Sequence, residues 1–191
     1  MKTVEGYRTP RQTDTRYAAL LRLSTSGWPG IGYAGDVALV RILVDGYSLL
    51  HQWTSLAPGR PRYSAAAREE LVHVLTRYQD YCGTPITIVF DGSGPARGAD
   101  ETASTDEVEV LFSRDGQTAD QIIERVAFRL QDYGEALAIT DDYAERDTVM
   151  NMGGMASSCA EFIRTVESAL TELESDVKNY NQRERARYRQ G

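Results

Sequence analysis

The stretch VRILVDGYSLLHQW, from Val40 to Trp53, decides how the rest of the chain is interpreted. An apolar run, Ile42–Val44, ends in the carboxylate of Asp45, and a glycine and a mostly apolar, helix-like segment follow at once. The β-branched and apolar residues before Asp45 are typical of a strand that is buried on both faces of a sheet. A charge at the end of such a strand therefore needs an explanation.

The composition fits one globular domain with an added arm. The chain has 191 residues, of which 41% are hydrophobic and 26% charged, and this is enough for a sizeable core. No apolar run approaches the roughly 20 residues of a membrane span, and the first residues lack the apolar stretch of a secretory signal. The two cysteines have no metal-binding spacing and indicate reduced thiols inside a cell. We therefore expect a cytoplasmic protein without membrane contact, with an organellar stroma or matrix left open.

The net charge of -7 argues against a dedicated duplex-DNA binder, which usually carries a basic balance or stripe. A site built from carboxylates produces an acidic balance, and so does an ordinary solubility surface. The net charge alone does not choose between these two origins.

Three regions of the chain differ in composition. Residues 1–36 mix Gly, Pro, Thr and Arg, which predicts an N-terminal arm that is partly disordered. Residues 37–178 alternate strand-like and helix-like segments and form the predicted domain. Residues 179–191, NYNQRERARYRQG, predict a polar, Arg-rich tail that frays.

The alternation within the domain predicts an α/β fold with a mostly parallel sheet. Helices are expected over 64–83, over 118–134 and from Ser158 onward, with Ser64 as one cap and Thr118 with Gln121 as a capping box. Strands are expected over 37–44, 85–90, 107–113 and 135–140, with a short fifth strand within 152–157.

Three of the apolar strands end in aspartate: Asp45, Asp91, and the pair Asp141 and Asp142. In open parallel sheets the ligand crevice lies beyond the carboxyl ends of the strands, so these side chains are expected to converge. Asp120 joins them from the first turn of a helix, and Glu124 lies four residues further on the same helix face.

Carboxylates held so close together repel one another and raise one another's pKa, and a divalent cation removes that penalty. Oxygen ligands without nearby His or Cys favour Mg²⁺ or Mn²⁺ over Zn²⁺. Such an ion can activate water and neutralise the charge of a phosphate under attack. The sequence therefore predicts that Asp45 ends its strand because the strand presents it to a metal.

Each carboxylate also has a simpler interpretation. An aspartate after a strand is commonly a turn residue or a helix cap, which stays open for Asp91 and is expected for Asp142 even if it also binds metal. Glu145, with Asp142, is expected to cap a short following helix. Asp141 has the alternative of a solvated neighbour, and Glu124 that of an exposed helix residue. The joint pattern of strand ends and a helix start favours a shared site.

Four stretches together resemble a known family: ILVDGYSLL, TIVFDGSG, EVLFSRDGQTADQIIERVA and AITDDYAERD. Their order and spacing are similar to the YacP-like NYN domain, which belongs to the PIN-like nuclease superfamily. The resemblance covers about Arg41 to Leu170, and GQTAD followed by IIER is its most specific part. It implies a PIN-like three-layer fold, in which helices flank the sheet.

The resemblance also implies a metal-dependent endoribonuclease acting on single-stranded RNA with Mg²⁺ or Mn²⁺. One bacterial branch of the family is associated with messenger RNA on the translating ribosome. By this likeness the acidic positions are Asp45, Asp91, Asp120 and Asp142. The family usually has Asn where this chain has Ser48, which reaches less far. The alternative function is therefore a non-catalytic RNA- or ribosome-binding domain on the same fold, weakened at Ser48.

Several arginines are candidates for contacts to RNA. Arg60 and Arg62 lie in a loop beside Tyr63, where a base could stack while arginine meets phosphate. Arg97 lies in the glycine-rich loop beyond the second strand, and Arg68 lies on a helix that resembles the first long helix of the family. Ordinary solvated loops are the alternative. The chain lacks the sequence signature of a phosphatase or receiver domain, which disfavours that class. The sequence leaves the oligomeric state open.

Overall fold

The computed structural model describes residues 39–92, 107–113 and 116–188. The predicted N-terminal arm and Arg97 lie outside these residues. The strands of the described part are β1 (Leu39–Asp45), β2 (Ile86–Phe90), β3 (Val108–Phe112), β4 (Glu135–Ile139) and β5 (Met155–Ser157). They form one sheet in the order β3-β2-β1-β4-β5, and each neighbouring pair is parallel.

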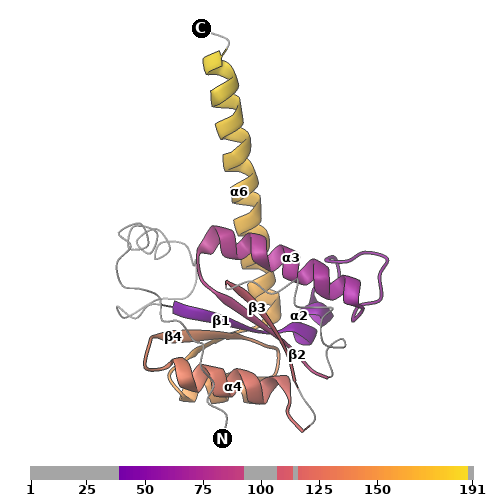
Figure 1. Cartoon of the computed structure of the whole chain (residues 1–191), viewed down its shortest axis with the longest axis vertical. Coiled ribbons are helices and arrows are strands. Elements are labelled where there is room, and N and C mark those ends of the chain that lie inside the picture. The colour runs from indigo at the N-terminus through magenta and orange to yellow at the C-terminus, as the bar shows by residue number, and fades with distance from the viewer. Residues whose placement is uncertain (1–38, 93–106, 114–115, 189–191) are drawn as a thin grey trace, which may run out of the picture. The chain divides into compact units, whose positions relative to one another are not determined.

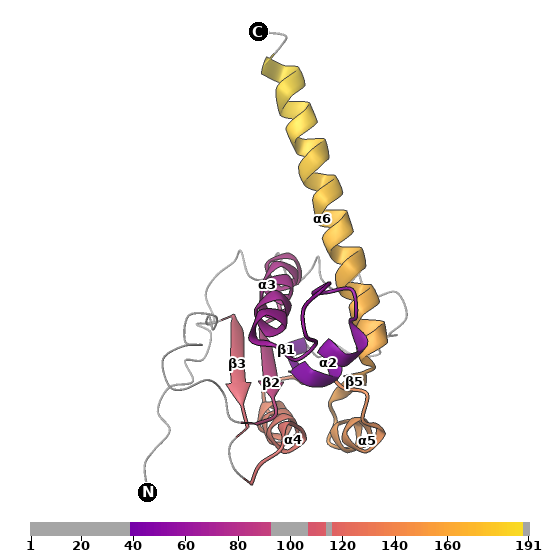
Figure 2. The same ribbon diagram turned by 90° about the vertical axis from the view of Figure 1, so that its right-hand side faces the viewer.

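Helices cover both faces of this sheet. They are α2 (Gly46–Gln52), α3 (Ala65–Cys82), α4 (Ala119–Leu130), α5 (Tyr143–Asn151) and α6 (Cys159–Tyr188). Figures 1 and 2 show α4 and α5 on one face and α2, α3 and α6 on the other. The expected α/β class, a parallel sheet between two helical layers, is confirmed.

The parallel register decides where the strand ends meet. β1 lies at the centre of the sheet with β2 and β4 on its two sides, and its apolar core residues are fully buried. Asp45 ends β1, Asp91 follows β2, and Asp141 follows β4 by two residues. These carboxylates therefore stand at the same, carboxyl edge of the sheet.

The local signals in the sequence explain the helix starts. The Ser64 hydroxyl accepts a hydrogen bond from the Ala67 N–H, and Thr118 with Gln121 forms the predicted capping box. Gly46 is required for a different reason. A Cβ at this position would lie 2.3 Å from Cε1 of Phe90, so only glycine lets this ring pack against the start of α2.

The end of the chain differs from the prediction. Helix α6 continues through residues 179–188, where the sequence predicts a tail that frays. This segment contains Gln, Arg, Glu and Ala, which favour helix, and it contains no Gly or Pro. Among the described residues, none of the helices combines the length and apolarity needed to cross a membrane.

Candidate metal centre

Asp45 is both the last residue of β1 and the N-cap of α2. Its Oδ1 accepts hydrogen bonds from the N–H groups of Tyr47 (3.0 Å) and Ser48 (3.1 Å). Its Oδ2 accepts a hydrogen bond from the Ser48 hydroxyl at 2.5 Å. These three donors fix the orientation of the carboxylate, which remains half-exposed at the sheet edge.

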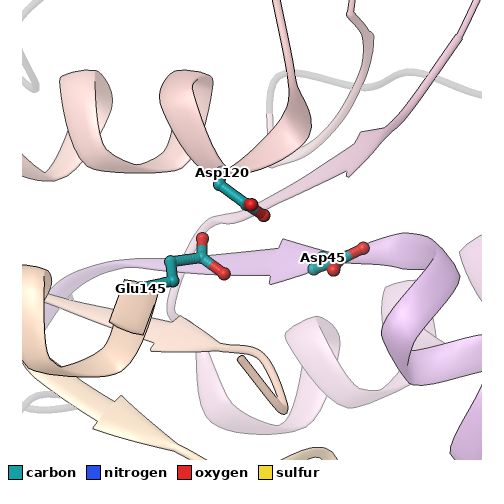
Figure 3. A group of neighbouring side chains, drawn as sticks. All are labelled: Asp45, Asp120 and Glu145. Carbon is teal, nitrogen blue, oxygen red and sulfur yellow. The ribbon is translucent and has the colours of Figure 1, made fainter. Parts of the chain in front are cut away.

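Two further carboxylates approach Asp45 from the helices on one face of the sheet. Asp120 lies in the first turn of α4, and Glu145 lies in the first turn of α5. One oxygen from each of the three residues lies within 4.8 Å of the others. Figure 3 shows the side chains of Asp120 and Glu145 pointing toward each other, with Asp45 beside them at the end of β1. We call Asp45, Asp120 and Glu145 the inner carboxylates.

Of the three inner carboxylates, Glu145 is the most deeply buried. It is only 3% exposed, and no hydrogen bond of normal geometry reaches its carboxylate oxygens among the described residues, although the Thr140 hydroxyl lies near enough to oppose the rise of its pKa. Burial, reinforced by the charges of Asp120 and Asp45, raises its pKa to about 8. Burial and then the charge of Asp45 also raise the pKa of Asp120. An apolar environment and like charges thus oppose full ionisation of this group.

A divalent cation fits this donor set. Buried ionised carboxylates without partners are strongly destabilising, and a bound cation supplies the missing opposite charge. The donors are all oxygens, which suits Mg²⁺ or Mn²⁺ better than softer metals. The inner carboxylates are therefore the described residues that could hold such an ion.

Asp91 takes the turn-and-cap role that the sequence left open. Its Oδ1 accepts hydrogen bonds from the Ala119 N–H (2.6 Å) and from the Ser113 hydroxyl (3.1 Å). It thereby ties the end of β2 to the start of α4. It lies outside the group of inner carboxylates, although its charge contributes to the raised pKa of Asp120.

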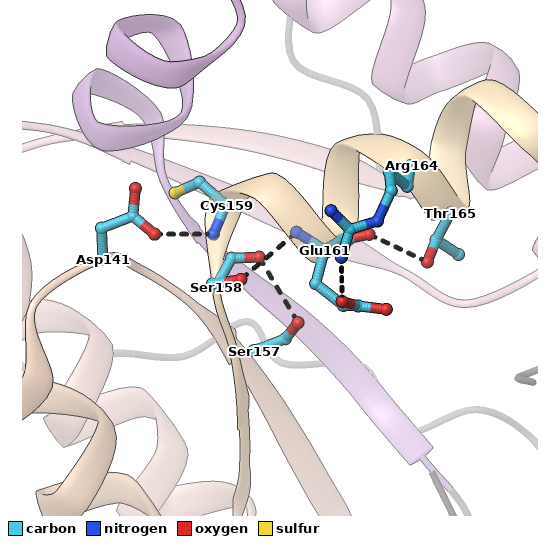
Figure 4. A network of polar contacts seen from close by, with 7 residues as sticks. All are labelled: Asp141, Ser157, Ser158, Cys159, Glu161, Arg164 and Thr165. Carbon is cyan, nitrogen blue, oxygen red and sulfur yellow. Dashed lines mark hydrogen bonds and ion pairs between the residues drawn. The ribbon is translucent and has the colours of Figure 1, made fainter. Parts of the chain in front are cut away.

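Asp141 and Asp142 also hold helix starts. Asp142 is the N-cap of α5 and accepts hydrogen bonds from the N–H groups of Ala144 and Glu145. Asp141 accepts a hydrogen bond from the Cys159 N–H (2.9 Å) at the start of α6, beside the network of Ser158 and Glu161 (Figure 4). Both aspartates are exposed and lie outside the group of inner carboxylates.

Sequence reasoning gave Glu145 the wrong role. It stands three residues after the N-cap Asp142, which is capping-box spacing, but its side chain turns into the site instead of reaching back (Figure 3). Glu124, the alternative helix carboxylate, is half-buried on α4 and does not belong to the inner group. The same acidic spacing is compatible with both roles, so the sequence carried no decisive signal for Glu145.

The candidate RNA contacts lie on the other face of the sheet. Arg68 donates a hydrogen bond to the Tyr63 carbonyl, and its guanidinium carbon lies 6.0 Å from the Phe90 ring centroid and 5.8 Å from that of Phe112. Arg60 and Arg62 are exposed and line a cavity of about 150 Å³ whose lining includes no carboxylate. The Ser48 hydroxyl donates its hydrogen bond to Oδ2 of Asp45.

The fold is a parallel α/β sheet with acidic side chains gathered at its carboxyl edge, and the comparisons with known proteins identify it as nuclease-like. The family model of the YacP-like NYN domain matches residues 42–190, and the chain belongs to this family. The NYN domain is part of a nuclease superfamily.

Individual relatives agree with this assignment. The protein named "Uncharacterized protein YacP" of Bacillus subtilis (strain 168) is 30% identical over 138 residues, which are 72% of this chain and 81% of the relative. The crystal structure of Rae1 (YacP) from Bacillus subtilis has a TM-score of 0.62 at 27% identity, covering 78% of this chain and 85% of that one. A tryptophan-to-leucine variant of it has a TM-score of 0.64 at 28% identity, covering 75% and 85%.

Proposed function

We propose that this chain is a metal-dependent endoribonuclease that cleaves single-stranded RNA. The observation that carries the proposal is the group of inner carboxylates, Asp45, Asp120 and Glu145, with one oxygen of each within 4.8 Å of the others. The buried and unpartnered Glu145 supports a cation in this place, because the group is otherwise left without a compensating charge. Membership of a nuclease superfamily supports phosphodiester hydrolysis as the reaction.

The three residues differ in exposure, and we infer different roles for them from this difference. Glu145 is buried at the back of the site, and Asp45 and Asp120 are half-exposed toward solvent, where a phosphate can approach. Ser48 and the start of α2 hold Asp45 in one orientation. A divalent cation bound there would supply positive charge to the phosphate and lower the pKa of an attacking water.

Arginines and aromatic rings next to the site support RNA as the substrate. Tyr47 follows Asp45 closely, and its ring centroid lies 5.5 Å from that of Tyr63, which is 50% exposed. The neighbouring Arg62 contacts His51, and among the described residues it forms no ion pair with a carboxylate. Exposed aromatic rings beside arginines are the usual means of holding single strands.

The test is cleavage of a labelled single-stranded RNA with Mn²⁺ or Mg²⁺. We expect products with a 5′-phosphate and a 3′-hydroxyl, no cutting in EDTA, and cutting slowed more than about 100-fold in Asp120→Asn. The two histidines of the chain, His51 and His73, are exposed, and neither belongs to the inner group. Attack by the ribose 2′-hydroxyl, with a cyclic phosphate product, would contradict the proposal.

The assay is repeated with RNA bound to ribosomes, because a nuclease of this family could need that context. If the wild-type chain binds RNA or ribosomes but cuts neither substrate with Mn²⁺, the nuclease function is rejected. The chain would then be a non-catalytic RNA- or ribosome-binding domain on the same fold.

A further inference from the structure

Tyr143 is the first residue of α5 and stands directly after the N-cap Asp142. Its side chain is 78% exposed, the highest value among the large apolar and aromatic side chains of the described residues. Side chains on a helix lean toward its N-terminus, and the N-terminus of α5 lies at the carboxyl edge of the sheet. The ring therefore stands at the edge that carries the inner carboxylates.

Arg146 lies one turn further along α5 and supports this ring. Its guanidinium carbon lies 4.2 Å from the ring centroid of Tyr143, a close cation–π contact. Carboxylates are near in sequence, but Arg146 forms no ion pair among the described residues, and its Nε is buried without a hydrogen-bond partner. Within the described residues the positive charge of Arg146 therefore meets the ring of Tyr143 but no carboxylate.

The position of this pair relative to the site follows from helix geometry. Glu145 lies between Tyr143 and Arg146 in sequence, and its own side chain enters the inner group. Two residues along a helix correspond to a rise of about 3 Å, and a helix with its side chains is about 10–12 Å wide. Residues two apart point to opposite sides of a helix, so a base on Tyr143 would lie on the other side of α5 from the Glu145 side chain, about one helix width from the carboxylates.

A comparable pair lies on the other face of the sheet. Tyr63 precedes α3, and its hydroxyl contacts Nδ1 of His51 at 2.9 Å, which Arg62 also contacts. Figure 2 shows α5 below the sheet and α3 above it, with α2 beside the strands. The inner carboxylates, with Asp45 at the end of the central strand, lie between these two faces.

We propose that Tyr143 and Arg146 form a second binding position for single-stranded RNA. A base stacks on the ring of Tyr143, and the guanidinium of Arg146 binds a neighbouring phosphate. The strand then crosses the carboxyl edge from the side of Tyr63 to the side of α5, over the inner carboxylates. This inference rests on the proposed function, from which it takes RNA as the ligand.

The test is the binding of a fluorescein-labelled single-stranded RNA and of its duplex, measured by anisotropy. All variants carry Asp120→Asn so that the probe stays intact. Tyr143→Ala should weaken single-strand binding at least about 5-fold, the lower end for loss of one base–aromatic stack, and leave duplex binding unchanged. Tyr143→Phe should bind like its parent. Tyr133→Ala is the matched control, because Tyr133 is 68% exposed but directly precedes β4 at the opposite edge.

Arg146→Gln tests the phosphate contact separately. It should reduce the slope of log affinity against log salt by about 0.7, the value for one phosphate contact on a single strand. Tyr143→Ala should leave that slope unchanged, because stacking releases no counterions. An unchanged slope in Arg146→Gln overturns the role of this residue.

The outcomes separate this inference from the proposed function. If the chain cuts RNA but Tyr143→Ala binds single strands as tightly as Tyr133→Ala, the inference is overturned and the nuclease stands. If Tyr143→Ala selectively weakens single-strand binding but the wild-type chain never cuts, the binding position stands and the nuclease is rejected. If the parent does not bind single-stranded RNA at all, the inference is overturned, and the nuclease is decided by the cutting assays on free and ribosome-bound RNA alone.

Discussion

Two sets of carboxylates share the carboxyl edge of this sheet, and their surroundings differ. The outer set, Asp91, Asp141 and Asp142, is exposed, and each member accepts backbone N–H groups at the start of a helix. The inner set gathers within 4.8 Å, and Glu145 has no hydrogen-bond partner among the described residues. Asp45 combines both roles, because it caps α2 and faces the other inner carboxylates.

The difference shows what separates a structural carboxylate from one kept for a ligand. A cap is stabilised by donors that the fold itself provides, so its charge is compensated without a ligand. A buried carboxylate without donors destabilises the fold unless it is protonated or meets a cation. The predictions below test this distinction between the two sets, from the largest expected effect to the smallest.

The largest effect is the pH dependence of stability in the metal-free chain. The pKa of Glu145 is raised from 4.5 to about 8, so between these values the folded state holds a proton that the unfolded state has lost. The free energy of unfolding should therefore fall as pH rises from about 4.5 to about 8, by on the order of 3–5 kcal/mol. Glu145→Gln should remove most of this slope.

Urea unfolding in EDTA at a series of pH values measures how the free energy of unfolding depends on pH. Asp142→Asn, at the N-cap of the same helix, is the control and should keep most of the wild-type slope, because the charge of Asp142 adds the smallest of the named contributions to the raised pKa of Glu145. Equal slopes in the wild type and in Glu145→Gln would show that Glu145 is ionised normally, and the distinction between the two sets would fail.

The second effect is on catalysis. Asp45→Asn and Asp120→Asn should each lower the rate of RNA cutting more than about 100-fold, beyond the 10- to 100-fold typical of partners that only orient ligands. The double variant should be little slower than either single variant, because the residues act as one unit. Single-turnover cleavage measures this, and losses that multiply in the double variant would argue against a shared ion.

The third effect is stabilisation by the ion. At a free Mn²⁺ concentration 100 times its Kd, the wild-type chain should gain about 2.7 kcal/mol, visible as a higher melting temperature. Glu145→Gln should lose most of this gain, and Asp91→Asn should keep it, because Asp91 is held by Ala119 and Ser113. A melting temperature that is indifferent to millimolar Mn²⁺ counts against the metal centre.

The fourth effect concerns Ser48, where the resemblance described above leads us to expect Asn. Its hydroxyl donates to Oδ2 of Asp45, and hydrogen bonds to charged groups contribute about 1.5–3 kcal/mol. Ser48→Ala should therefore slow cutting about 10-fold without changing the products. Ser48→Asn should cut at least as fast as the wild type, because its amide also donates and reaches further. A slower Ser48→Asn would show that serine suits this site better.

The smallest effect belongs to the outer set. Asp142→Asn should change the cutting rate by no more than about 2-fold, because asparagine caps a helix about as well as aspartate. Its charge adds only a secondary contribution to the raised pKa of Asp120. Loss of activity comparable to that of Asp120→Asn would move Asp142 into the inner set.

The sequence alone determined the sheet and the place of the site. The apolar run before Asp45, the capping box at Thr118 and the alternation of strands and helices are local signals, and each produced the predicted element. Parallel strands have their carboxyl ends at one edge of the sheet, so three aspartates at strand ends were enough to place the site at that edge. Asp45 was found in this way and Asp120 from its place in the first turn of a helix, and their role as metal ligands stays a prediction.

Only the tertiary structure decided which carboxylates face one another. Asp142 and Glu145 have capping-box spacing, but packing of α5 on the sheet buries Glu145 and leaves Asp142 at the surface. Asp91 and Asp141 are compensated by N–H groups of Ala119 and Cys159, donors far away in sequence. Sequence spacing specifies which residues can reach an edge, whereas burial and hydrogen-bond partners depend on neighbours that only the folded chain brings together.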